Sequence, residues 1–183
     1  MTLDEIEKKY DVILADPPWK YRNWSKRGEG KGASGQYDTM AVDDIMRLPV
    51  GSIAAKNSVL FMWATFPLLP QAIEVMRAWG FDYKTGGAWA KKTKNGKDAF
   101  GTGYIFRSAA ELFLVGTRGH VSPLNRSTRN IINAVAREHS RKPDEQYELI
   151  ENLFPGTNRI ELFARQHRLG WDVFGNETDK FGG

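Results

Sequence analysis

The chain has 183 residues, of which 41% are hydrophobic and 26% charged, a composition typical of one globular domain spanning residues 1–183. A chain of this length buries roughly 70% of its unfolded surface, so it needs neither a metal nor a disulfide for stability. The sequence contains no cysteine, which excludes disulfides, thiolate nucleophiles and cysteine-ligated zinc. We expect a cytoplasmic protein without membrane contact, because no apolar run reaches membrane-spanning length and no signal peptide opens the chain.

The net charge is +4, but the positive charges are unevenly distributed along the chain. The stretches 20–31, 84–97 and 118–142 hold 16 of the 26 lysines and arginines but only two of the 22 acidic residues. Two of these stretches also carry aromatic residues. Basic side chains neutralise phosphates and aromatic faces stack on exposed bases, so the pattern favours a nucleic-acid partner. The alternative is that these are solvated surface loops.

Short strands alternate with helices along the sequence. We expect strands at 10–15, 59–63, 83–90, 110–116, 159–164 and 171–174, helices at 42–48, 70–79 and 143–154, and either state at 131–136. This alternation predicts an α/β fold with a mainly parallel sheet and helices on both faces. Two glycine- and lysine-containing segments, about 20–37 and 92–103, are expected to form long mobile loops.

Two turns follow predicted strands and should lie at the same edge of the sheet. Asp16-Pro17-Pro18-Trp19 comes directly after the strand 10–15, and the turn at 165–167 comes after the strand 159–164. Ligands of parallel sheets bind beyond the carboxyl ends of the strands. We therefore expect both turns on one ligand-binding rim.

The Asp16-Pro17-Pro18-Trp19 turn is the motif that most clearly suggests chemistry. An ionised Asp16 only accepts hydrogen bonds, and Pro17 has a carbonyl outside any strand ladder. The two prolines fix these acceptors relative to each other, and Trp19 supplies a flat apolar surface. This set complements a planar base with an exocyclic amino group, such as adenine at N6 or cytosine at N4. The alternative is a strand-ending turn with a buried tryptophan.

Beyond this turn, the sequence resembles the MT-A70 family of S-adenosylmethionine-dependent adenine-N6 methyltransferases. The matching motifs, in the family's order, are Asp16-Pro17-Pro18-Trp19, Tyr37-Asp38-Thr39-Met40, Asp43-Asp44-Ile45-Met46, Leu60-Phe61-Met62-Trp63-Ala64-Thr65, Trp89-Ala90-Lys91, Ser140-Arg141-Lys142-Pro143-Asp144-Glu145, Pro155-Gly156-Thr157, Ile160-Glu161-Leu162-Phe163-Ala164-Arg165 and Gly175-Asn176-Glu177. The resemblance implies a Rossmann-like methyltransferase fold with permuted motif order, because the Asp-Pro-Pro-Trp turn precedes the presumed cofactor strand near Ile160.

The resemblance also assigns roles to individual residues. It implies that S-adenosyl-L-methionine lies across the rim, with Lys142 at its carboxylate. The implied catalytic residues are Asp16, Pro17, Pro18 and Trp19, and the implied cofactor contacts are Asp16, Lys142, Arg165, His167, Asn176 and Glu177. The expected substrate contacts are Tyr21, Arg22, Tyr37 and Lys91.

Each assignment has a structural alternative. Lys142 could be a solvated lysine beside a helix, Arg165 could pair with Glu161, and His167 could be an ordinary surface histidine. Trp63 is expected to pack in the core. The histidines lack metal-ligand spacing, so we predict no metal site.

The resemblance implies direct methyl transfer to adenine N6. We expect DNA as the substrate, because the chain is a bare catalytic domain without the extra domains of eukaryotic RNA-modifying relatives, although the motifs do not separate DNA from RNA. Adenosine-N6 methylation of RNA is the second interpretation, and a catalytically inactive nucleic-acid-binding relative is the third. Cytosine-N4 enzymes usually have a serine in place of Asp16. The sequence leaves a homodimer open.

Overall fold

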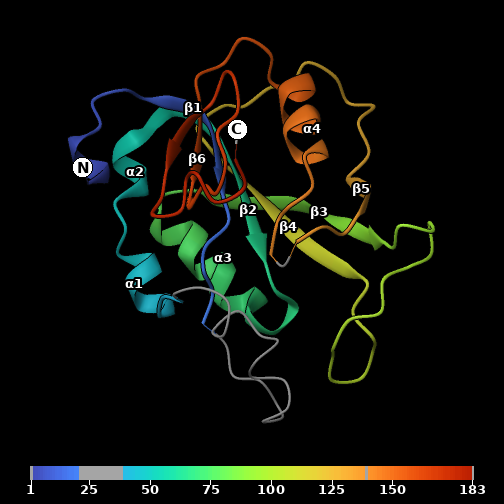
Figure 1. The fold of residues 1–183 in the computed structure, drawn as a ribbon. Helices are drawn as coiled ribbons and strands as arrows, with labels where there is room; N and C mark the ends of the chain where they lie inside the picture. Colours follow the sequence, from blue (N-terminus) through green and yellow to red (C-terminus); the bar gives the residue numbers. More distant parts are fainter. Residues whose placement is uncertain (1, 21–38, 139, 183) are drawn as a thin grey trace.

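The computed structural model describes residues 2–20, 39–138 and 140–182 (Figure 1). Strands and helices alternate in it, as the sequence predicts. The elements are the 3-10 helix η1 (Leu3–Glu5), β1 (Tyr10–Ala15), α1 (Val42–Met46), α2 (Val50–Ile53), β2 (Ala54–Ala64), the 3-10 helix η4 (Phe66–Leu68), α3 (Leu69–Ala78), β3 (Asp82–Lys92), β4 (Ala110–Arg118), β5 (Ile131–Val135), α4 (Glu145–Leu153), β6 (Arg159–Leu162) and β7 (Asp172–Phe174).

The strands form one sheet in the order β5-β3-β4-β2-β1-β6-β7. Parallel pairing joins β1 to β2 and β6, β6 to β7, and β3 to β5. The strand β4 runs antiparallel to both of its neighbours, β2 and β3. The sheet is therefore mainly parallel, as predicted, with a reversed strand that the sequence pattern did not reveal.

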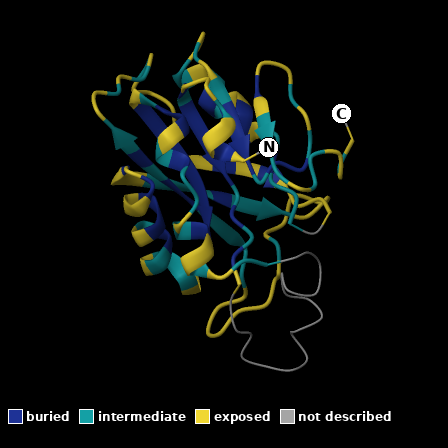
Figure 2. Cartoon of the chain, turned by 90° about the vertical axis from the view of Figure 1, so that its left-hand side faces the viewer, coloured by how far each residue is buried: buried dark blue, intermediate teal, exposed yellow. Residues whose placement is uncertain are grey.

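Helices cover both faces of this sheet, with α3 on one side and α4 on the other (Figure 1). Alternate residues of β1 point to opposite faces: Ile13 and Ala15 pack with the α1–α3 side, and Val12 and Leu14 pack with the α4 side. Buried residues are concentrated in the central strands (Figure 2). The predicted α/β fold with helices on both faces is confirmed.

The structure also shows which conformation is adopted by residues 131–136, which the sequence left ambiguous between strand and helix. Residues 131–135 form β5, in which Ile132 and Ala134 are buried while their neighbours are exposed. That alternation has the period of a half-buried strand. Trp63 in β2 is 2% exposed, which confirms its expected place in the core.

Two connections were predicted to be long loops. Residues 93–109 join β3 to β4 without a helix or strand. Most of the loop predicted at 20–37 lies outside the described residues. Among the helices that the structure describes, none is long and apolar enough to cross a membrane.

Candidate active site

The candidate site lies at the edge of the sheet where β1, β2, β6 and β7 end. Because β4 is antiparallel, it begins where its neighbours finish: Glu111 pairs with Trp89 near the end of β3, and Leu112 pairs with Ala64 at the end of β2. Glu111 therefore belongs to the same rim as Asp16, which follows the last residue of β1.

Four charged side chains form a row along this rim. The Nζ of Lys142 lies 3.1 Å from Oδ1 of Asp16 and 2.8 Å from Oε1 of Glu111. The Nζ of Lys91 lies 2.8 Å from Oε2 of Glu111. The side chains of Lys142 and Asp16 are only 10% and 14% exposed. Acid and base alternate along the row, so each buried charge has a neighbour of opposite sign.

Burial and ion pairing act in opposite directions on the pKa values in this row. Burial raises the pKa of Glu111, but the positive charges of Lys142 and Lys91 outweigh it and lower the value to about 2. Burial lowers the pKa of Lys142, whereas Asp16 and Glu111 raise it above its ordinary range. At neutral pH Glu111 is therefore an anion and Lys142 a cation, so these two side chains can orient polar groups through their charges.

Two tryptophan rings support the lysines from the sheet. The Nζ of Lys142 lies 5.5 Å from the centre of the Trp63 ring, and that of Lys91 lies 4.8 Å from the Trp89 ring. The indole of Trp63 donates a 2.7 Å hydrogen bond to Oε1 of Gln146 on α4. The rings and the charged row thus share the face of the sheet that α4 covers.

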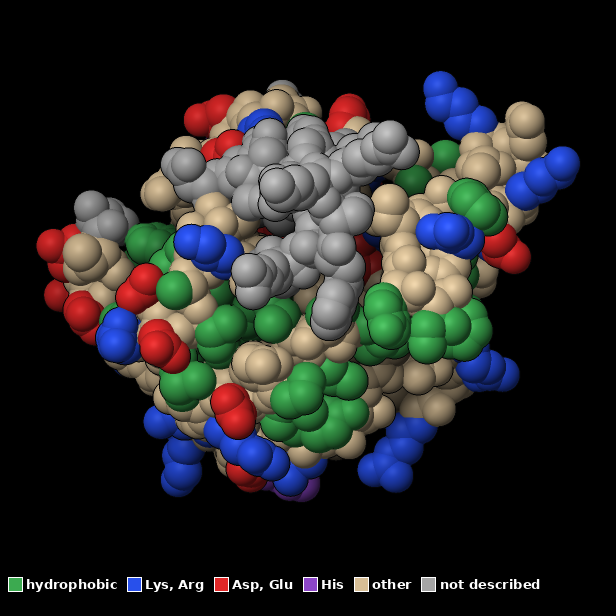
Figure 3. Space-filling model, turned by 90° about the horizontal axis from the view of Figure 1, so that it is seen from below, with side chains coloured by type: hydrophobic (Ala, Val, Ile, Leu, Met, Phe, Trp, Pro, Cys, Tyr) green, Lys and Arg blue, Asp and Glu red, His purple; other side chains and the backbone are tan. Residues whose placement is uncertain are grey.

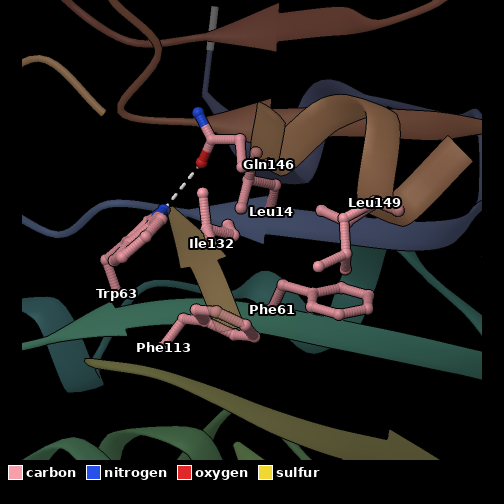
Figure 4. Close-up of a pocket in the computed structure, with 8 residues that line it drawn as sticks. Leu14, Phe61, Trp63, Phe113, Ile132, Gln146 and Leu149 are labelled. Carbon is pink, nitrogen blue, oxygen red and sulfur yellow. Dashed lines mark hydrogen bonds between the residues drawn. The ribbon is translucent and has the colours of Figure 1, made fainter. Parts of the chain in front are cut away.

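A small apolar pocket lies behind these rings, between the sheet and α4 (Figure 4). Its wall includes Gln146, whose side chain points to Trp63. Its other lining residues are Leu14, Phe61, Phe113, Ile132, Leu149 and Ile150. With no charged side chain in its wall, this pocket is part of the core and offers nothing to a polar reaction.

The Asp16-Pro17-Pro18-Trp19 turn is anchored at both backbone and side chain. The backbone N–H of Trp19 donates to the Pro17 carbonyl over 2.8 Å, and that of Met40 donates to the Pro18 carbonyl over 2.9 Å. The indole of Trp19 donates to the Trp63 carbonyl over 3.0 Å, and Trp19 is 4% exposed. Trp19 is thus an anchor in the core. The exposed stacking surface suggested by the sequence is not presented, because the ring is enclosed.

A hollow that is open to solvent adjoins Asp16 and Lys142. It is lined by Asp16, Ser140, Arg141, Lys142, Gln146, Tyr147, Glu161, Phe163, Arg165, Gln166 and Phe181. The turn after β1 and the turn after β6 therefore share one rim, as the strand pattern predicts.

Glu161 is a buried carboxyl group in the wall of this hollow. The Tyr147 hydroxyl donates a 2.7 Å hydrogen bond to its Oε2. Burial raises the pKa of Glu161 to about 7; the Tyr147 hydrogen bond opposes this rise, and the charge of Asp16 adds to it. The sequence left open an ion pair between Arg165 and Glu161. In the structure, the Nε of Arg165 lies 3.5 Å from Oε2 of Glu177.

Unusual backbone conformations shape the hollow. Ser140 and Phe163 have φ angles of 63° and 59°, in the left-handed region that non-glycine residues rarely adopt. A Cβ on Gly175 would lie 2.9 Å from the Ala164 backbone nitrogen, so only glycine allows this approach of β7 to β6. The close approach brings Glu177 next to Arg165.

The remaining predicted cofactor contacts lie further out. His167 is exposed, with Nε2 3.2 Å from Oδ1 of Asp179, and Asn176 is exposed after β7. Lys180 holds Glu177 through a 2.7 Å contact. The predicted substrate contacts Tyr21, Arg22 and Tyr37 lie outside the described residues. Within the described ranges, no three histidine, aspartate or glutamate side chains form a group that could hold a metal.

Sequence reasoning missed Glu111, Tyr147 and Arg141. The available signal for Glu111 was an acid inside an otherwise apolar strand, since residues that alternate with it pack in the core. Tyr147 gave no comparable signal, because a tyrosine in a helix is ordinary. Arg141 lies in the matching motif around Lys142 but was given no role of its own.

Comparison with known proteins adds an independent observation. The MT-A70 family model matches residues 10–177. The chain is 35% identical to the type II methyltransferase M.MunI of Mycoplasma sp, over 96% of this chain and 82% of that protein. It is 31% identical to the human N(6)-adenosine-methyltransferase catalytic subunit METTL3, over 93% of this chain but 28% of that protein. It is 32% identical to a putative N(6)-adenosine-methyltransferase MT-A70-like protein of Medicago truncatula, over 94% of this chain and 27% of that protein.

Proposed function

Because this chain belongs to the MT-A70 family, we propose that it transfers the methyl group of S-adenosyl-L-methionine to N6 of adenine in DNA. The observation that carries the proposal is the position of Asp16. Its carboxylate lies at the end of β1, is held by Lys142 and forms part of the wall of the hollow.

The hollow has the chemistry that S-adenosyl-L-methionine requires. The ligand carries a carboxylate, an ammonium, a sulfonium and a ribose diol, so its site needs both cations and acceptors. Lys142 and Arg165 supply cations, and Asp16 and Glu161 supply carboxyl oxygens. The Nε of Arg141 is buried without a hydrogen-bond partner among the described residues, which leaves a donor for a ligand oxygen.

These residues fit the two ends of the cofactor. We assign Lys142 to its carboxylate, and Glu177, held by Arg165, to the ribose hydroxyls. The exposed Asn176 and His167 are assigned to the outer, ribose and adenine end. When bound, the cofactor supplies an electrophilic methyl group on a positively charged sulfur.

The chain's own contribution is to hold and polarise the amine. Asp16 accepts one N–H of the adenine amino group, and the Pro17 carbonyl accepts the other. The Trp19 N–H occupies one lone pair of that carbonyl, which leaves the second lone pair for the base. Accepting both hydrogens concentrates the nitrogen lone pair for attack, and the proton leaves after alkylation to Asp16 or water.

In this proposal, most of the acceleration of methyl transfer comes from positioning the two reactants. Holding two reactants in line can supply about 7–11 kcal/mol of a barrier. The ion pair with Lys142 and the turn fixed by Trp19 keep both acceptors in place before the substrate arrives. No covalent enzyme intermediate is needed.

Similarity supports DNA ahead of RNA, since the chain is 35% identical to the Mycoplasma type II methyltransferase and 31–32% identical to the relatives named for adenosine. Adenosine in RNA is the second candidate substrate.

The test is to identify the methylated nucleoside. Duplex DNA, single-stranded DNA and RNA are each incubated with enzyme and cofactor, digested to nucleosides and measured by mass spectrometry. The proposal expects N6-methyl-2′-deoxyadenosine. N6-methyladenosine from RNA alone would assign the substrate to RNA, and a methylated cytosine would contradict the proposed chemistry.

A further inference from the structure

A loop at the rim concentrates exposed apolar side chains. Phe100, Tyr104, Ile105 and Phe106 are between 78% and 83% exposed. They lie on the connection 93–109, which extends away from the sheet between β3 and β4 (Figure 1). Grouped apolar side chains on a surface mark a place where something binds.

The loop is tied to the site at its base. The Ala99 N–H donates to the Lys91 carbonyl over 2.9 Å, and the Lys91 N–H donates to the Ala109 carbonyl over 2.8 Å. Further out, the Gly101 N–H donates to the Ser108 carbonyl over 2.8 Å. These bonds close the neck of the loop and hold its tip outward. Its apolar side chains are thus presented from the strand ends that carry the charged row.

Cations accompany the apolar side chains. The loop carries Lys94, Lys97 and Arg107 against one acid, Asp98, which is already paired with Lys92 at 2.6 Å. The guanidinium of Arg107 lies 5.7 Å from the centre of the Phe100 ring. Seen from below, hydrophobic side chains and Lys and Arg side chains share this side of the molecule (Figure 3).

This mixture distinguishes between the partners that an apolar loop could have. The core of a protein–protein interface is depleted of charged residues, above all lysine. A nucleic-acid strand requires the opposite combination, with cations for its phosphates and aromatic faces for its bases. A polyanion is also attracted to the loop's excess positive charge, whereas a second copy of the loop is repelled.

We infer that the loop 93–109 binds an unpaired nucleic-acid strand beside the target base. Phe100, Tyr104 and Phe106 stack on bases, and the loop's cations contact phosphates. The inference rests on the proposed function and deepens it, because it names the element that holds the substrate strand. Since the loop is fixed at Lys91, a strand bound there runs past the charged row toward Asp16.

The experiment measures strand affinity by fluorescence anisotropy of a labelled oligonucleotide, single-stranded or duplex, over a range of salt. The variant Phe100→Ala/Tyr104→Ala/Phe106→Ala should bind the single strand at least about tenfold more weakly, with the salt slope unchanged. The variant Lys94→Gln/Lys97→Gln/Arg107→Gln should instead reduce the salt slope.

A matched control replaces an exposed apolar residue elsewhere. Leu169 is 99% exposed and precedes β7, so it lies at the opposite edge of the sheet. Leu169→Ala should leave strand affinity unchanged. All variants should keep the wild-type circular dichroism spectrum and affinity for S-adenosyl-L-methionine, since the replaced side chains are exposed.

Three results would overturn the inference. They are wild-type protein that fails to bind single strands, an aromatic variant that binds as tightly as wild type, or an aromatic variant whose only defect is loss of self-association in light scattering. The proposed function fails separately. Loop-dependent strand binding without methyl transfer to any nucleic acid would contradict the reaction and support the role of the loop.

Discussion

The ammonium of Lys142 lies 3.1 Å from the carboxylate of Asp16, joining the segment before α4 to the end of β1. The same ammonium contacts Glu111, which in turn contacts Lys91. Buried charges are tolerated when each has a partner, so these side chains form one electrostatic unit. The proposed reaction depends on this unit, because it fixes the acceptor that faces the amine.

Removing the shared cation should destabilise the fold. Lys142→Met leaves Asp16 and Glu111 side by side without their common partner, at an expected cost of about 3–5 kcal/mol in the free energy of unfolding. Urea denaturation at neutral pH measures this. Adding Asp16→Asn to Lys142→Met should recover part of the loss, because Asp16 is the carboxylate that loses its partner, whereas Glu111 keeps its ion pair with Lys91.

The control for this prediction is a surface ion pair. Lys8 and Asp172 are 2.7 Å apart, but both are about half exposed. Lys8→Met should cost about 0–1 kcal/mol. Equal losses for Lys8→Met and Lys142→Met would contradict the account of the buried row.

Glu161 should make stability depend on pH. Its pKa is raised from 4.5 to about 7 in the folded protein, so between these values the folded state holds a proton that the unfolded state has lost. The contribution of Glu161 to stability is present below this window and is lost as pH rises through it. Glu161→Gln should therefore gain stability relative to wild type across this window, by at most about 3 kcal/mol.

Denaturation curves of both proteins at several pH values from about 5 to about 8 test the sign of this shift. The stability difference should grow with pH and level off above the pKa of Glu161. A difference that stays constant across the series would show that Glu161 titrates normally.

Gly175 should control cofactor affinity through the backbone. A Cβ there meets the Ala164 nitrogen and oxygen at 2.9 and 3.0 Å, so Gly175→Ala forces the ends of β6 and β7 apart. Separating Glu177 from Arg165 should weaken S-adenosyl-L-methionine binding about tenfold or more, as measured by calorimetry, with about 1–3 kcal/mol lost in stability.

Gly156→Ala is the comparison for Gly175→Ala. Gly156 has φ +67° and open space around its Cβ position, and it precedes β6 at the far edge of the sheet. Its substitution should cost stability through backbone strain while cofactor affinity stays at the wild-type value. Weakened binding in Gly156→Ala alone would contradict the role given to Gly175.

The substitution Trp19→Phe distinguishes two roles of Trp19, which are to anchor the turn after β1 and to stack on the substrate base. Phenylalanine keeps an aromatic face but removes the indole N–H that donates to the Trp63 carbonyl. We expect a loss of about 1–3 kcal/mol in unfolding free energy, because that buried carbonyl loses its donor. Unchanged stability, with a raised KM for the nucleic acid, would restore the stacking role.

The fold was largely predictable because hydrophobic period and turn residues are local signals. The apolar run at 59–63 indicated the strand β2, and Asp16-Pro17-Pro18 marked the end of β1, whereas the segment of β5 stayed ambiguous between strand and helix. The direction of β4 was not predictable, since an antiparallel central strand has the same apolar pattern as a parallel one. Glu111 was missed for that reason: only the reversed strand brings it to the rim.

The site was predictable where a motif or a strand end placed it. Asp16, Lys142 and Arg165 converge on the hollow as the sequence implies. The enclosure of Trp19 and the bond from Tyr147 to Glu161 depend on which surfaces meet in three dimensions. Sequence spacing carries no information on such tertiary contacts.

The most direct test of the account is methyl transfer from labelled S-adenosyl-L-methionine to adenine-containing DNA by wild type and Asp16→Asn, with cofactor affinity measured on the same samples. Asparagine is similar in size to aspartate but carries no negative charge. We predict that transfer by Asp16→Asn falls by about a thousandfold or more while cofactor affinity changes by less than about tenfold. Near-wild-type transfer by Asp16→Asn would contradict the assignment of Asp16 to the reacting amine.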